Sequence, residues 1–116
     1  MNEKQNSSRE ETILYAVLNS ATEYAIIVLD SENRIAIWNR GAENILGWSA
    51  EEALGQGGDI FFTPEDRARG AVEWEIAKAR SEGWAEDERW HLRKDGSTFW
   101  GSGMLTPLNG GFARAA

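Results

Sequence analysis

The feature that most constrains the fold is the stretch from Glu86 to Leu108, which reads EDERWHLRKDGSTFWGSGMLTPL. Aromatic, apolar and charged residues alternate on both sides of Lys94-Asp95-Gly96, and Asp-Gly between alternating segments is a strong signal for a hairpin turn. The stretch therefore predicts a long β-hairpin. We expect the residues before it to pack against this sheet, and those after it to form one further strand.

Two registers are open for this hairpin, and a shift of one residue exchanges its two faces. A two-residue turn at Asp95-Gly96 pairs His91 with Trp100, whereas a turn with Gly96 as a G1 bulge pairs His91 with Phe99. We favour the bulged register, because it gives one face a cross-strand aromatic pair and leaves the other face two glycines that allow a close approach. The first face then carries Trp90, Leu92, Trp100, Ser102 and Met104, and the second carries His91, Phe99, Gly101, Gly103 and Leu105.

Composition narrows the class of protein. The 116 residues suffice for one domain with a modest core. Twelve Lys and Arg against nineteen Asp and Glu give a net charge of −7, which argues against binding to nucleic acid or anionic membranes. The absence of cysteine excludes disulfides, thiolate metal sites and a cysteine nucleophile. No apolar run approaches the roughly 18–20 residues that span a bilayer, so we expect a cytoplasmic domain.

The first third of the chain predicts a helix followed by two strands. Met1–Ser7 is polar and expected to be disordered, and a capping box of Ser8 and Glu11 predicts a helix over residues 8–21. The continuous apolar run Tyr24–Asp30 predicts a buried strand, and the alternating segment Arg34–Trp38 predicts its hairpin partner. The apolar stripe of the helix must be covered by the sheet or by a second subunit; it consists of Ile13, Leu14, Val17, Leu18 and Ala21.

The middle of the chain predicts three helices. Asn39 is placed to cap a short helix through Leu46, and Ser49 with Glu52 forms a second capping box. Thr63 and Pro64 then predict one long helix that ends at Gly83. Helices segregated from strands along the chain indicate an α+β domain with an antiparallel sheet. The inner face of the long helix is predicted to carry Ala68, Val72, Ile76 and Ala79, with Trp74 exposed on the other side.

With these elements in place, the chain resembles a bacterial PAS sensor domain of the kind found at the input end of histidine kinases. The segments that carry the resemblance are Ile26–Gly55, Phe62–Gly70 and Glu88–Leu108. The resemblance implies a PAS core over residues 22–116, a five-stranded sheet in the order 2-1-5-4-3, and a small-molecule pocket between sheet and helices. It also implies that the fifth, central strand is still running where the chain ends. A central strand cut short would leave both neighbours with unpaired backbone, so we expect a marginally stable or dimer-dependent domain.

The hairpin is also similar to that of the flavin-binding photosensory (LOV) branch of the same superfamily. Two asparagines that face the flavin in that branch fall on His91 and Gly101 of this chain. The photoreactive cysteine of that branch falls near Gly58, and this chain has no cysteine. The resemblance therefore does not extend to covalent flavin photochemistry.

The function implied by the resemblance is a sensory input domain. It would bind a small ligand or a partner and relay a conformational change to an effector, such as a histidine kinase, that this chain lacks. No nucleophile–base pair, metal-ligand set or cofactor motif supports an enzyme. The ligand pocket is expected to be framed by Ile60, Phe62, Val72, Ile76, His91, Phe99, Gly101 and Gly103, with either Ile27 or Val28 from the first strand.

Two alternatives remain open at this stage. A ligand-free homodimerisation scaffold would use a partner surface made of Leu14, Val17, Leu18, Trp74, Trp90 and Trp100. A redox or gas sensor would hold flavin or haem, and His91, the single histidine, would then be a candidate ligand to haem iron as well as to a small molecule. The acids Glu65, Asp66, Glu86, Asp87 and Glu88 are assigned to helix capping and to a solvated strand edge rather than to metal binding.

Overall fold

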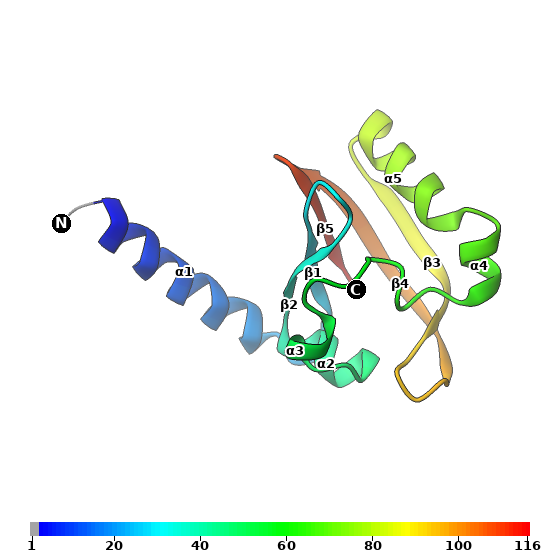
Figure 1. Ribbon diagram of the computed structural model, residues 1–116, viewed down its shortest axis with the longest axis horizontal. Coiled ribbons are helices and arrows are strands. Elements are labelled where there is room, and N and C mark those ends of the chain that lie inside the picture. Colours follow the sequence, from blue (N-terminus) through cyan, green and yellow to red (C-terminus); the bar gives the residue numbers. More distant parts are fainter. Residues whose placement is uncertain (1–2) are drawn as a thin grey trace.

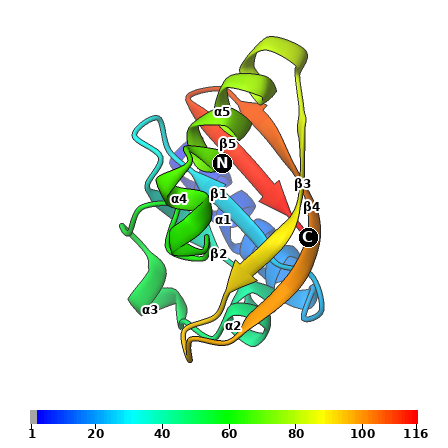
Figure 2. The ribbon, with the colours of Figure 1, turned by 90° about the vertical axis from the view of Figure 1, so that its right-hand side faces the viewer.

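The computed structural model describes residues 3–116, with side chains from Ser8 onward. Its elements follow in the order α1 (Glu3–Ser20), β1 (Ile26–Leu29), β2 (Ile35–Trp38), α2 (Arg40–Leu46), α3 (Ala50–Ala53), α4 (Pro64–Ala68), α5 (Ala71–Glu82), β3 (Ala85–Leu92), β4 (Thr98–Leu108) and β5 (Gly111–Ala115). The five strands form one antiparallel sheet in the order β2-β1-β5-β4-β3. Helices α4 and α5 lie on one side of this sheet and α1 projects from the other (Figures 1 and 2). The predicted α+β architecture and strand order are confirmed.

The β3–β4 hairpin adopts the bulged register. His91 pairs with Phe99 and Trp90 with Trp100, and Gly96 closes the turn at a φ of 88°. Alternation then buries His91 on the face under the helices and leaves Trp90 and Trp100 on the outer face, 55% and 57% exposed. The two indoles meet edge to face with their ring centroids 5.7 Å apart. Turn chemistry and alternation together therefore fixed which side chains face the core.

The central strand β5 pairs on both sides. Every residue of β1 has a β5 partner, and reciprocal backbone hydrogen bonds between Ala25 and Ala116 extend the ladder. The expectation that both neighbours of this strand would be left unpaired is therefore wrong for β1. On the other side, β5 pairs with Met104–Leu108 of β4, and the segment from Thr98 to Gly103 has no β5 partner among residues 3–116.

Two helix boundaries differ from those that the sequence predicted. Helix α1 begins at Glu3 rather than Ser8, because Glu, Lys and Gln in this stretch are good helix formers with no proline or glycine among them. Ser8 therefore lies inside α1, where its carbonyl oxygen accepts a hydrogen bond from the Thr12 hydroxyl, and it caps nothing. Of the segment predicted to be disordered, residues 3–7 form the start of α1, and Met1 and Asn2 lie outside the described residues.

The predicted long helix is two helices, α4 and α5. Gly70 separates them with a φ of 78°, a left-handed conformation that costs glycine little and would strain other residues. The break turns the chain, so that α5 lies against β3 and β4. Ala68 is exposed as a result, whereas Val72 and Ala79 on α5 are buried and Ile76 is half-buried.

Asn39 joins three elements at one end of the sheet. As the N-cap of α2, its Oδ1 accepts hydrogen bonds from the backbone N–H groups of Ala42 and Ile26. Its Nδ2 donates to the carbonyl oxygens of Leu18, Ala21 and Tyr24. This buried side chain thus fixes the end of α1 against the starts of β1 and α2.

Candidate functional site

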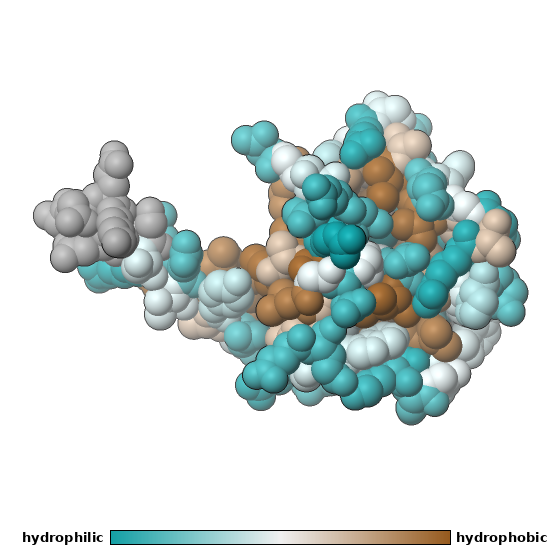
Figure 3. Space-filling model, in the orientation of Figure 1, coloured by the Kyte–Doolittle hydropathy of each residue, from teal (hydrophilic) through white to brown (hydrophobic). Residues whose placement is uncertain are grey.

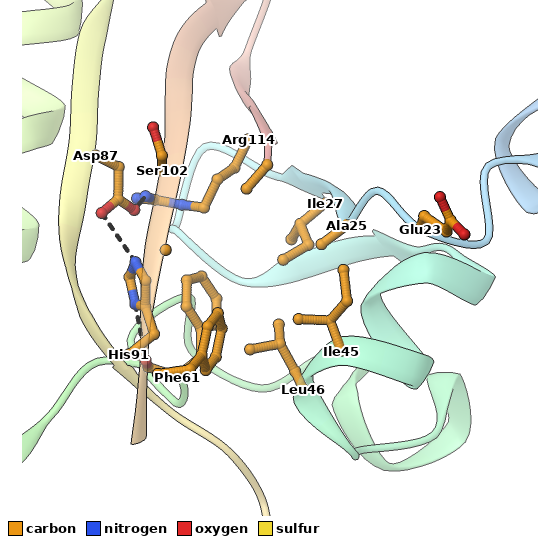
Figure 4. Close-up of a pocket in the computed structure, with 13 residues that line it drawn as sticks. Glu23, Ala25, Ile27, Ile45, Leu46, Phe61, Asp87, His91, Ser102 and Arg114 are labelled. Atoms are coloured by element: carbon orange, nitrogen blue, oxygen red, sulfur yellow. Dashed lines mark hydrogen bonds and ion pairs between the residues drawn. The ribbon is translucent and has the colours of Figure 1, made fainter. Parts of the chain in front are cut away.

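A pocket of about 140 Å³ lies between the inner face of the sheet and α2. Its apolar wall consists of Ala25, Ile27, Ile45, Leu46, Phe61 and Phe99. Its polar wall consists of Asp87, His91 and Arg114, and Glu23 and Ser102 are exposed at its rim. Figure 4 shows Asp87, His91 and Arg114 gathered on one side, with Ile27, Ile45 and Leu46 facing them from the other.

The residues predicted to frame a pocket divide into two groups. His91, Phe99 and Gly101 line this pocket, and Ile27 rather than Val28 supplies the first strand's contribution. The others lie elsewhere: Phe62 and Val72 are buried in the core, Ile60 and Ile76 pack half-buried against it, and Gly103 faces the end of β5. A Cβ atom at Gly103 would lie 2.6 Å from the Ala115 carbonyl oxygen, so this glycine makes room for the chain's own backbone.

His91 is held by two acceptors and by aromatic rings. Its Nδ1 lies 3.0 Å from the Phe61 carbonyl oxygen and its Nε2 lies 2.9 Å from Oδ1 of Asp87. Because both partners accept, both contacts are hydrogen bonds only when the ring carries a proton on each nitrogen. Neither nitrogen then has a lone pair to offer, so the geometry does not fit a histidine ligand to haem iron.

The His91 ring also packs closely against Gly101 on β4. A Cβ atom at Gly101 would lie 2.9 Å from Cδ2 of His91 and 3.4 Å from the Phe99 ring. The room that the sequence predicted at Gly101 is therefore used by the imidazole itself.

Asp87 is the centre of a buried charge cluster, which we define as Asp66, Glu75, Asp87, Arg89 and Arg114. Its carboxylate accepts from Nη1 of Arg114, from Nε of Arg89 at 3.1 Å and from His91. Arg89 also reaches Glu75 at 2.8 Å and Asp66 at 3.4 Å, and Arg114 reaches Glu75 at 2.9 Å. Glu75 is wholly buried, and Arg114 is 4% exposed. The charge cluster thus ties α4, α5, β3 and β5 together beside the pocket.

Burial and charge act against each other on the two most buried acids. Burial alone would raise the pKa of Asp87, but the hydrogen bond from His91 and the charges of Arg114, His91 and Arg89 outweigh it and lower that pKa. Burial raises the pKa of Glu75, the charge of Asp87 adds to this effect, and Arg114 and Arg89 only partly offset it. The ionised form is therefore favoured at Asp87 and disfavoured at Glu75.

This cluster was not predicted from the sequence. The assignment of the acids to capping and a solvated edge holds for the exposed Glu65, Glu86 and Glu88, and it is wrong for Asp87, which is buried and ion-paired. Asp66 is also buried, and it pairs with Arg69 as well as with Arg89. Strand alternation could have found Asp87 and Arg89, since both share the inward parity of His91.

Glu75 and Arg114 were missed altogether. Glu75 lies three residues after Val72 and four before Ala79, which places it on the apolar stripe of α5. Arg114 lies two residues after the buried Phe112 on β5 and so faces the same side of the sheet. A charged residue on an apolar stripe is a signal for a buried ion pair, because an unpaired buried charge is too costly to keep.

Two further findings bear on cofactors. Within the residues whose side chains are described, no group of three His, Asp or Glu side chains is placed to hold a metal ion. At Gly58, near which the photoreactive cysteine of the LOV branch falls, a Cβ atom would lie 2.8 Å from Cδ2 of Leu29 and 2.7 Å from Oδ1 of Asn33, so a larger residue there would require these side-chain ends to move. In addition, no helix among residues 3–116 has the length and hydropathy needed to cross a bilayer.

A family model described as PAS fold matches residues 13–110. The chain belongs to the PAS family. The sheet order and the pocket between sheet and helices are those that membership implies. This PAS domain is also similar in structure to the PAS domain of a protein from Colwellia psychrerythraea, with a TM-score of 0.81, 26% sequence identity, and coverage of 90% of this chain and 92% of that chain.

Two curated relatives are signalling proteins. Two-component system protein A of Emericella nidulans is 38% identical over 105 residues, which cover 90% of this chain and 15% of that protein. Sensor protein FixL of Bradyrhizobium diazoefficiens is 37% identical over 59 residues, which cover 51% of this chain and 12% of that protein. The chain thus spans less than a sixth of either relative. It is a PAS sensory domain related to two-component and FixL sensor proteins.

Proposed function

We propose that this PAS domain is a ligand-operated input domain that relays a change of conformation to an effector, such as a histidine kinase, in a longer signalling protein. The observation that carries the proposal is the pocket itself: apolar on one side and bounded on the other by a charge cluster that spans both layers of the fold. A ligand that alters the packing of His91 or Arg114 therefore acts on β3, β5 and α5 together. Only a difference in its affinity for two packings can shift the domain between them.

The pocket size argues against flavin and haem. Pockets for drug-sized molecules occupy about 300–1,000 Å³, and this pocket, at about 140 Å³, is less than half of the lower limit. A cavity of about 150 Å³ is known to hold benzene. The expected ligand is therefore a small molecule of about that size. An absorption spectrum of the purified chain with a flavin or Soret band would contradict this.

The experiment that tests ligand binding is a ¹H–¹⁵N NMR titration of the 116-residue chain with small aromatic molecules. We expect shift changes centred on Ile45, Phe61 and Gly101. The variant Ile45→Phe fills the pocket and should abolish them, whereas the control Ile26→Phe, on the outer face of the neighbouring strand β1, should not. Equal binding by both variants would refute the pocket as the site.

The relay is tested by hydrogen exchange on the same samples. Ligand should change the exchange protection of α5, because Glu75 on that helix is bonded to pocket-lining Arg114. Binding that leaves α5 unchanged would refute the relay while leaving the binding site intact.

A homodimer is a second proposal, favoured by the apolar side chains that remain uncovered. Leu14 and Val17 are exposed on α1 and Leu18 is half-buried, and Figure 3 shows hydrophobic residues along this helix where it meets the domain. Trp90 and Trp100 are exposed on the outer face of the sheet, and Trp74 is exposed on α5. Large apolar side chains of this kind dominate binding energy at interfaces.

Light scattering after size exclusion tests the dimer. The wild-type chain should elute with the mass of a dimer and the double variant Leu14→Glu/Val17→Glu with that of a monomer. Ser8→Glu places a charge on the opposite side of α1 and should leave the dimer intact. A wild-type monomer at concentrations in the tens of micromolar would refute this second proposal.

A further inference from the structure

Arg114, which lines the polar wall of the pocket, has one donor edge without a partner among residues 8–116. All of the hydrogen bonds and ion pairs that Arg114 makes within residues 8–116 use Nη1, which is bonded to Glu75 and Asp87. Nε is buried and has no hydrogen-bond partner among these residues. In a guanidinium group, Nε–H and one N–H of Nη2 point in the same direction along one edge, which forms the fork that arginine presents to oxygen acceptors.

A buried donor without a partner is costly, and native structures rarely leave one. Arg114 is held in place by two kinds of contact. Its guanidinium is bonded to two carboxylates, and its Cζ atom lies 5.4 Å from the ring centroid of Phe61 and 5.1 Å from that of Phe62. It also lines the pocket. A ligand atom that accepts a hydrogen bond there would therefore satisfy a group that the fold itself leaves unpaired.

The charges around this edge favour a neutral acceptor over an anion. The Arg114 guanidinium already serves the carboxyl groups of Glu75 and Asp87, so a ligand carboxylate at the same guanidinium would be the third. A ligand carboxylate there would be repelled by the Asp87 carboxylate, whereas a neutral acceptor would not.

We propose that the pocket takes a small, mainly apolar molecule with one carbonyl oxygen, which accepts a hydrogen bond from the Nε–Nη2 edge of Arg114 while its apolar body packs against Ile27, Ile45 and Leu46. This inference rests on the proposed function and adds the chemical class of the ligand. It assigns Arg114 as the residue that determines specificity.

Three molecules of nearly the same shape test it: cumene, acetophenone and benzoate. Cumene lacks an acceptor, acetophenone has a neutral carbonyl, and benzoate has an anionic one. In NMR titrations of the full 116-residue chain, we expect acetophenone to bind about tenfold or more tighter than cumene, as a hydrogen bond to a charged donor implies, and tighter than benzoate. Acetophenone should also shift the Arg114 Nε–H signal, and cumene should not.

The variant Arg114→Lys keeps the charge and removes the forked pair of donors. The ratio of the cumene Kd to the acetophenone Kd should therefore fall towards one. If this variant does not fold, the Nε–H signal of the wild-type chain decides the matter alone. Cumene binding as tightly as acetophenone would overturn the inference and leave ligand binding intact, and tightest binding by benzoate would overturn the choice of a neutral ligand. Failure of all three at the pocket residues would overturn both this inference and the proposed function.

Discussion

Replacing Asp87 by Asn should remove a large part of the stability of this domain. The two side chains have nearly the same shape, but Asn carries no charge and has a single acceptor oxygen. Asp87 meets donors on every side, from His91, Arg89 and Arg114, so an amide NH₂ group would face at least one of them. The buried guanidinium groups would also lose their shared counter-charge.

The expected cost follows from this geometry. Breaking a buried ion pair by removing one partner costs about 3–5 kcal/mol, and Asp87 is only 3% exposed. Total stabilities of domains are about 5–15 kcal/mol, so the variant should retain a fold of low stability. At roughly 4 °C per kcal/mol for a domain of this size, its Tm should fall by about 12–20 °C.

Urea denaturation followed by circular dichroism measures this loss at pH 7, with an unchanged m value as the check that the same surface unfolds. Glu86→Gln is the matched control, because Glu86 is the exposed neighbour of Asp87 on β3, and its effect should stay within about 0.5 kcal/mol. A loss below about 1 kcal/mol for Asp87→Asn would show that the charge cluster does not hold the layers together.

The dependence on pH gives a second check of the same reasoning. Because the folded pKa of Asp87 lies below its ordinary value of 3.8, its stabilising effect is present above that value and is lost as the pH falls through the folded pKa. The difference in unfolding free energy between wild type and Asp87→Asn should therefore be largest near neutral pH and should disappear as the pH falls below about 4. A difference that is constant over this range would refute the ion-pair account.

Three further changes test other parts of the structure. Glu75→Gln should show the opposite dependence on pH. Because burial raises the folded pKa of Glu75 above 4.5, its contribution to stability is present below that value and is lost as the pH rises. In the same urea series, the difference in unfolding free energy between wild type and this variant should therefore narrow from acidic to neutral pH. Asn39→Ala should cost about 2–4 kcal/mol and speed amide exchange at the end of α1, because several backbone groups lose their partner; Asn44→Ala, which removes one exposed hydrogen bond, is its control. Gly101→Ala should cost about 1–3 kcal/mol in urea melts and shift the His91 ring signals in NMR spectra, and unchanged ring signals would contradict the close packing.

Local chemistry explains what the sequence predicted correctly. Asp95-Gly96 and the alternation on either side of it determined the hairpin register, and with it the side of the sheet that carries His91. The side chains of Asn39 and Ser49 marked the starts of α2 and α3, because each caps a helix through atoms a few residues away. These signals are contained in short stretches of chain.

The missed features depend on residues far apart in the sequence. The reason that Glu75 can be buried lies in Arg89 and Arg114, 14 and 39 residues further along the chain. The residues around Gly70 do not show whether this glycine lies within a helix or interrupts it. The packing of α5 against the sheet determines that it interrupts the helix. The pocket likewise depends on where α2 lies relative to β4 and β5, because residues from all three elements line it, and no local pattern records that arrangement.

The attachment of α1 has a mechanical consequence. Its 18 residues form a rod about 27 Å long, and Asn39 clamps only the end nearest the sheet, at the start of the helix that supplies Ile45 and Leu46 to the pocket. A tilt of roughly ten degrees at the clamp would swing the far tip through about 5 Å. A displacement of α2 that is too small to disturb the core would therefore produce a displacement several times larger at the far end of α1.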